Sequence, residues 1–176
     1  MHDLTDILIG ATTHIGPEYF RLPVHGGGPI YRERVYCYEL YHQMRLRWPA
    51  EGPFRLNGEV DKNAHPILSQ LGASYAKPDL LVHGPGDMGL NHAIIEVKSL
   101  MARPAGIRKD LKTLSLFRTA VGYERAIYLI YGGEELGYVC EAIERIAQAM
   151  QNLPSIEVWA HQQVGHPAAH IFSVGG

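Results

Sequence analysis

The chain has 176 residues, of which 46% are hydrophobic and 19% charged, and this composition predicts one soluble globular domain rather than a disordered chain. The formal net charge of −2 does not by itself favour a nucleic-acid partner, since domains that bind nucleic acids are often strongly basic. No apolar run approaches the roughly 18 residues that cross a membrane, and the acidic first residues are unlike a signal peptide, so we expect a cytoplasmic protein with no membrane partner.

The first half of the chain predicts a helix followed by three strands. Residues 1–29 carry no clear pattern and end in a run of glycines, so we expect an N-terminal extension there and a single domain over residues 30–176. A helical pattern without internal glycine or proline then runs to Trp48, where Pro49 ends it. The predicted strands that follow cover residues 54–60, 79–83 and 93–97.

The second half of the chain alternates helices and strands. The predicted elements are a helix over residues 107–120, a strand over 126–131, a helix over 134–152 and a strand over 156–160. The early strands are close enough for antiparallel hairpins, whereas the helices between the later strands imply parallel crossovers. The expected fold class is therefore α/β, with a mixed central sheet flanked by helices.

The loop between the second and third strands brings two acidic residues into register. It covers residues 84–91 and contains three glycines and a proline. A symmetric antiparallel pairing about this loop places Asp79 directly opposite Glu96, with the two side chains about 5 Å apart on one face. Lys98 follows Glu96 by two residues and therefore shares that face.

This arrangement predicts a site for a divalent cation. Two carboxylates at such a distance repel each other unless a positive charge compensates them, and Mg²⁺ or Mn²⁺ is bound by carboxylates, water and substrate phosphate. An adjacent ammonium group suits the hydrolysis of a phosphate ester. The alternatives are an ion pair between Glu96 and Lys98, or a position of Glu96 at an exposed strand end.

Pro78-Asp79 followed by Glu96-Val97-Lys98 resembles the signature of the PD-(D/E)XK nuclease superfamily. The predicted order of elements is also similar to that superfamily's core, and the resemblance covers roughly residues 30–131. It implies a restriction-endonuclease-like fold, αβββαβ, to which this chain adds a helix and a strand.

The resemblance also implies a role for each matching residue. Asp79 and Glu96 would bind the metal ion through their carboxylates, and the main-chain carbonyl of Val97 would be a further ligand. Lys98 would position the attacking water and stabilise the developing negative charge. Glu39 would be the acid that many members carry on the first helix, although a solvated helix acid is the alternative. Glu59 and Asp61 lie near the first strand and are further candidates for the site.

The positive charge of the chain is concentrated after the Glu-x-Lys element. Six basic residues and one acid, Asp110, lie between Lys98 and Arg118. The helix that holds Arg108, Lys109 and Lys112 often contacts the phosphate backbone in the superfamily, and we expect the same here. A helix face turned to solvent or to a partner subunit is the alternative.

The sequence therefore predicts an Mg²⁺- or Mn²⁺-dependent endo- or exonuclease that binds and hydrolyses nucleic acid, with DNA favoured. The alternatives are a module that binds nucleic acid or assembles without cleavage, and a hydrolase of another phosphate ester. A homodimer would suit an enzyme that cuts both strands of a duplex. Tyr31, Tyr38 and Tyr41 are candidates for stacking on bases or for helix packing.

Overall fold

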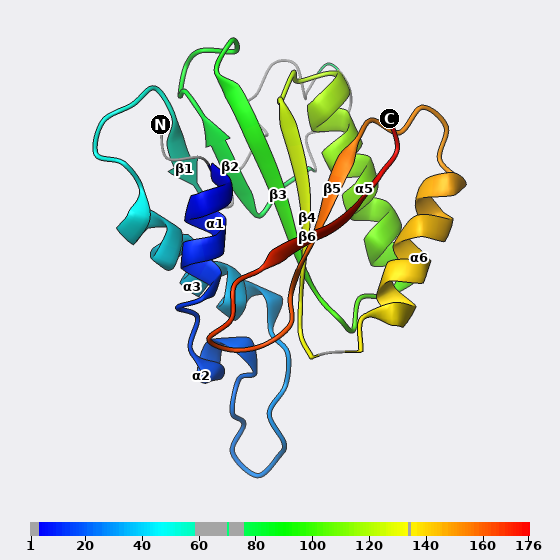
Figure 1. Cartoon of the computed structure of the whole chain (residues 1–176). Coiled ribbons are helices and arrows are strands. Elements are labelled where there is room, and N and C mark those ends of the chain that lie inside the picture. The colour runs from blue at the N-terminus through cyan, green and yellow to red at the C-terminus, as the bar shows by residue number, and fades with distance from the viewer. Residues whose placement is uncertain (1–3, 59–69, 71–75, 134) are drawn as a thin grey trace.

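The computed structural model describes residues 4–58, 70, 76–133 and 135–176. It is an α/β fold with a six-stranded, mixed, open sheet and helices on both sides (Figure 1). This confirms the expected fold class and the mixed sheet. Among the described residues, none of the helices has the length and apolar character needed to cross a membrane.

The strands lie in the sheet in the order in which they occur in the chain. The first three pair antiparallel, β3 with β4 and β4 with β5 pair in parallel, and β6 returns antiparallel to β5. Antiparallel hairpins at the start and helical crossovers later are as the spacing of the elements predicts. The strands are β1 (Arg55–Asn57), β2 (Leu80–His83), β3 (Asn91–Ser99), β4 (Arg125–Tyr131), β5 (Ile156–His161) and β6 (Ala169–Val174).

The helices form two groups. The helices α1 (Leu4–Thr12), α2 (Pro17–Phe20) and α3 (Glu33–Arg47) precede the sheet, while α5 (Pro104–Thr119) and α6 (Gly137–Gln148) are the parallel crossovers (Figure 1). Proline suits the first turn of α5, where its missing N–H leaves no helical bond unmade. The apolar residues of α5 then recur at helical spacing and turn one face of the helix to the core.

Successive residues of the central strands face two different hydrophobic cores. In β3, Ile94 packs with α5 and α6, whereas its neighbour Ile95 packs with α1 and α3. Each core covers one face of β4. This strand is therefore buried on both faces, as expected of a central strand in a parallel sheet. The site described below lies on the Ile94 side, because Glu96 and Lys98 follow Ile94 at the strand period of two.

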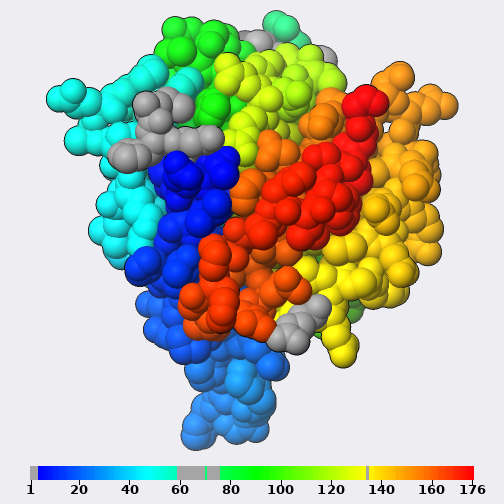
Figure 2. Space-filling view, viewed as in Figure 1, coloured from blue at the N-terminus to red at the C-terminus, as the bar shows by residue number. Residues whose placement is uncertain are grey.

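The N-terminal residues contribute to the core on the other side. The prediction treated residues 1–29 as an extension, yet Leu4, Ile7, Leu8 and Ala11 of α1 are buried against α3 and the sheet. The side-chain hydroxyl of Thr12 also accepts a hydrogen bond of 2.8 Å from a main-chain N–H just before β6. Figure 2 shows α1 beside β6 on one face and residues 21–30 projecting below them.

Two further elements differ from the prediction. The helix expected over residues 134–152 is shorter, because α6 begins at Gly137 and ends at Gln148; residue 134 lies outside the described part of the chain. The strand β6 was not predicted. It pairs with only one neighbour and its residues are mostly exposed, so it lacks the buried apolar run that identifies a central strand.

Candidate active site

The β2–β3 hairpin has the predicted register. Leu80 pairs with Ile95 and Leu81 with Ile94, and the same register continued by one residue places Asp79 opposite Glu96. A bulge between Val82 and His83 alters the pairing only near the loop, after this register is established. The two acids therefore lie side by side on one face of the sheet, not on opposite faces.

The two carboxyl groups are hydrogen-bonded to each other. The Glu96 carboxyl donates to Asp79, while Asp79 Oδ2 also accepts a bond of 2.8 Å from the main-chain N–H of Val97. Burial raises the pKa of both groups, and the neighbouring charge of Asp79 raises that of Glu96 further. The hydrogen bond places oxygens of the two carboxyl groups next to each other.

Lys98 lies between two other acids. Its Nζ is 3.1 Å from Glu33 Oε2 and 3.6 Å from Asp110 Oδ2. Burial acts to lower the pKa of Lys98, but Asp110 and Glu33 outweigh that effect and raise it, so the ammonium stays charged. Since Lys98 Nζ also donates a hydrogen bond to Glu33, its position is fixed from α3 on one side and from α5 on the other.

Asp110 was missed as a site residue by the reading of the sequence. It is only 4% exposed, and burial raises its pKa to about 6 despite the nearby Lys98. The hydroxyl of Tyr128 on β4 donates to Asp110 Oδ2 over 3.5 Å. A signal was present in the sequence, because Asp110 lies at helical spacing between Ile107 and Leu114 on the apolar stripe of α5.

The structure places Glu39, the predicted helix acid, apart from the other predicted site residues. Glu39 Oε1 accepts a hydrogen bond of 2.7 Å from Gln43, and Glu39 does not contact the other site residues. Six residues separate it from Glu33, which places it about 120° around the helix. Glu33, in the first turn of α3, is the acid of this helix that contacts Lys98, and it also accepts a bond of 3.3 Å from the main-chain N–H of Ser99.

The predicted phosphate-binding residues are exposed on α5. Arg108, Lys109 and Lys112 surround a hollow of about 280 Å³ that also includes Ala76. Because Ala76 precedes Asp79 by three residues, this hollow adjoins the segment that carries the first acid. The structure thus places the basic side chains beside the acid cluster but not in contact with its carboxyl groups, except that the charge of Lys109 influences Asp110.

A larger hollow, which we call the α3 groove, also borders the segment that carries Asp79. It has a volume of about 670 Å³ and lies between one face of α3, the end of β1 and the start of β2. Glu33 and Asp79 connect it to the acid cluster. It is lined by Glu33, Arg34, Cys37, Tyr38, Tyr41, Asn57, Gly58, Lys77, Asp79 and Leu80.

The side chains of the site provide some, but not all, of the ligands that a magnesium ion needs. The described residues contain no group of three or more His, Cys, Asp or Glu side chains poised to hold a metal ion. Mg²⁺, however, is usually held by one or two carboxylates and completes its shell with water and substrate phosphate, so the adjacent oxygens of Asp79 and Glu96 suit it. Glu59 and Asp61, the other acids considered, lie outside the described residues.

The charge of the cluster also favours a cation. Glu33, Asp79, Glu96 and Asp110 supply four carboxyl groups, and Lys98 supplies one ammonium. Full ionisation would therefore leave three negative charges in excess in a largely buried place, which is costly without a counter-charge.

The chain was also compared with known proteins. No family model, curated protein or solved structure matches it.

Proposed function

We propose that the protein is a metal-dependent nuclease with a PD-(D/E)XK-type, restriction-endonuclease-like core, and that it hydrolyses phosphodiester bonds, with DNA as the preferred substrate. The observation that carries the proposal is the meeting of Asp79, Glu96 and Lys98 on one face of the hairpin, beside a groove and a basic helix. A mere ion pair of Glu96 with Lys98 is disfavoured, because the partners of Lys98 are Glu33 and Asp110.

Asp79 and Glu96 would hold Mg²⁺ or Mn²⁺, with the Val97 carbonyl as a further ligand, and the metal would activate a water and neutralise phosphate charge. The N–H of Val97 orients the Asp79 carboxylate towards Glu96. Lys98 stabilises the negative charge that develops on the phosphate, and Glu33 and Asp110 keep its ammonium in place. Arg108, Lys109 and Lys112 bind the phosphate backbone outside the reacting group.

The direct test is cleavage of labelled DNA, RNA and free nucleotides in Mg²⁺, in Mn²⁺ and in EDTA. We expect metal-dependent cleavage of a polynucleotide, with Glu96→Gln inactive and Lys98→Ala slower by about 10²- to 10³-fold. The glutamine can still donate a hydrogen bond to Asp79, as the Glu96 carboxyl does, so this variant should fold.

A thermal melt of each variant is the matching control, since Lys98→Ala leaves the buried Asp110 without its cation and should lower the melting temperature. Metal-dependent hydrolysis of nucleotides alone would favour the other phosphate-ester hydrolase. Nucleic-acid binding without cleavage in either metal would favour the non-cleaving module. In both cases the nuclease proposal would be wrong.

A further inference from the structure

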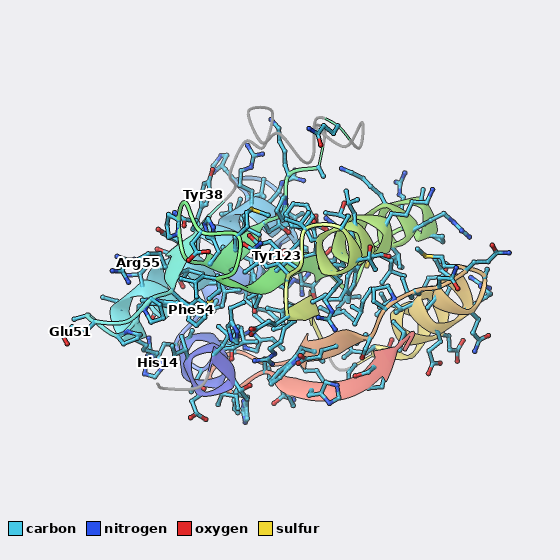
Figure 3. All side chains as sticks on the ribbon, turned by 90° about the horizontal axis from the view of Figure 1, so that it is seen from above. His14, Tyr38, Glu51, Phe54, Arg55 and Tyr123 are labelled. Carbon is cyan, nitrogen blue, oxygen red and sulfur yellow. The ribbon has the colours of Figure 1, made fainter. Side chains whose placement is uncertain are left out.

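An exposed aromatic side chain lies on the rim of the α3 groove. Tyr38 is 63% exposed and lines the groove, while Tyr41, one turn later on the same face of α3, is partly buried against the core. Figure 3 shows Tyr38 on the side of the molecule opposite β6. Tyr41 and Tyr31 thus serve packing, but packing does not account for Tyr38.

The groove is lined by side chains of the kinds that contact a polynucleotide strand. Arg34 and Lys77 bring positive side chains to the same hollow as Tyr38, and Asn57 adds an amide. The acids Glu33 and Asp79 also line it, and Asp79 would bind the metal ion of the proposed nuclease. The groove therefore offers an aromatic ring for a base and cations for its phosphates on the way to the reacting groups.

Stacking on Tyr38 requires a base whose face is accessible. In an undistorted duplex the faces of the bases are covered by their neighbours, and the grooves present the base edges. Unpaired bases expose their faces and stack on tyrosine without regard to sequence. The volume of about 670 Å³ is in the range of clefts that bind small ligands.

We propose that the nuclease acts on single-stranded nucleic acid, with a base next to the scissile phosphate stacked on Tyr38 in the α3 groove. This inference rests on the proposed nuclease function. Tyr38 follows Glu33 by five residues, which is a rise of about 7.5 Å along the helix. Stacked bases are about 3.4 Å apart along a strand, so this rise corresponds to about two nucleotides between a base on Tyr38 and the level of Glu33.

The test measures binding in EDTA, where cleavage cannot occur, of a labelled oligothymidylate and of a hairpin duplex of equal length. Tyr38→Ala should weaken binding of the single strand by about 5- to 150-fold, the loss of one stacked base. Tyr38→Phe keeps the ring and should restore binding to within about threefold. Tyr138→Ala is the matched control, because Tyr138 is 69% exposed but lies on α6, and it should bind as the wild type does.

A parallel cleavage assay in Mg²⁺ and Mn²⁺ separates the two proposals. Cleavage of the duplex in preference to the single strand, with Lys98→Ala impaired, would overturn the single-strand inference and leave the nuclease proposal standing. Single-strand binding that is insensitive to Tyr38→Ala would likewise overturn it. Single-strand binding that depends on Tyr38, without cleavage by the wild type, would instead overturn the nuclease proposal. Preferential cleavage of the single strand, slowed by Tyr38→Ala, supports both.

Discussion

Two glutamates of one helix provide a sharp test of the site. Glu33→Gln removes the negative charge that holds Lys98 but keeps an amide oxygen that can accept the hydrogen bond from Ser99. Glu39→Gln removes the same charge from the same helix at a position whose partner is Gln43. The two variants are therefore matched in chemistry and in secondary structure, and they differ in whether they contact Lys98.

The expected magnitude follows from the contact of Glu33 with Lys98. A hydrogen bond between charged groups contributes about 1.5–3 kcal/mol. The Glu33 side chain is 38% exposed, so solvent screening reduces this to about 1–2 kcal/mol. If the transition state loses this much stabilisation because Lys98 is misplaced, Glu33→Gln should slow single-turnover cleavage by about 5- to 30-fold. That is less than the effect of removing Lys98 itself.

The assay is single-turnover cleavage of a labelled oligonucleotide at saturating enzyme in Mn²⁺, together with a thermal melt of each variant. Glu39→Gln should cleave within about twofold of the wild type, as surface substitutions usually change free energies by less than about 0.5 kcal/mol. A loss of rate in Glu39→Gln that equals or exceeds that in Glu33→Gln would refute the assignment of Glu33. So would an unchanged rate in a well-folded Glu33→Gln.

Two other perturbations test the surface and the core. Replacing Arg108, Lys109 and Lys112 together by alanine should reduce the slope of log affinity against log salt by roughly 2–3. Single-turnover cleavage at saturating substrate should stay within about tenfold, because the metal ligands are unchanged; an unchanged salt slope would exclude phosphate contacts by this helix. His161 is fully buried, and burial lowers its pKa to about 4. The unfolded chain therefore takes up this proton as the pH falls from about 6.5 while the folded chain does not, so stability should fall between about pH 6.5 and 4, by up to about 3 kcal/mol. Denaturant unfolding at pH 7 and 4.5 should show a smaller loss in His161→Gln than in the wild type, and equal losses would contradict the assigned neutral His161.

The hairpin of the site was predictable because its register follows from local chemistry. A loop rich in glycine and proline fixes the turn, and the apolar residues on either side fix which faces are buried. Asp79 and Glu96 were therefore placed together from the sequence alone, as the observed pairing of Leu80 with Ile95 confirms. The helices and strands of the crossovers were predictable for a similar reason, since β4 is apolar on both faces and α5 is apolar on one.

The choice between Glu33 and Glu39 needed the rotation of α3 about its axis. The buried stripe of that helix, formed by Tyr36, Leu40 and Met44, sets this rotation and was readable at helical spacing. Glu33 precedes Leu40 by seven residues, so it lies near the stripe, whereas Glu39 lies to one side of it. The apolar residues of α1 have the same spacing and were also missed. The partners of Lys98, in contrast, depend on how α3 and α5 pack on the sheet.

Asp110 links the packing of the fold to the proposed chemistry. It occupies a core position of α5 between Ile107, Leu111 and Leu114, where an apolar residue would pack without cost. A carboxyl group buried there destabilises the fold unless a cation compensates it, and the only described ammonium within ion-pair distance is that of Lys98. The position of α5 against β3 and the position of the Lys98 ammonium are therefore stabilised by the same contact. Tyr128 donates one hydrogen bond to Asp110, and Lys98 supplies the compensating charge. A core carboxyl that holds a lysine in this way would suit the proposed nuclease, in which Lys98 must be placed accurately.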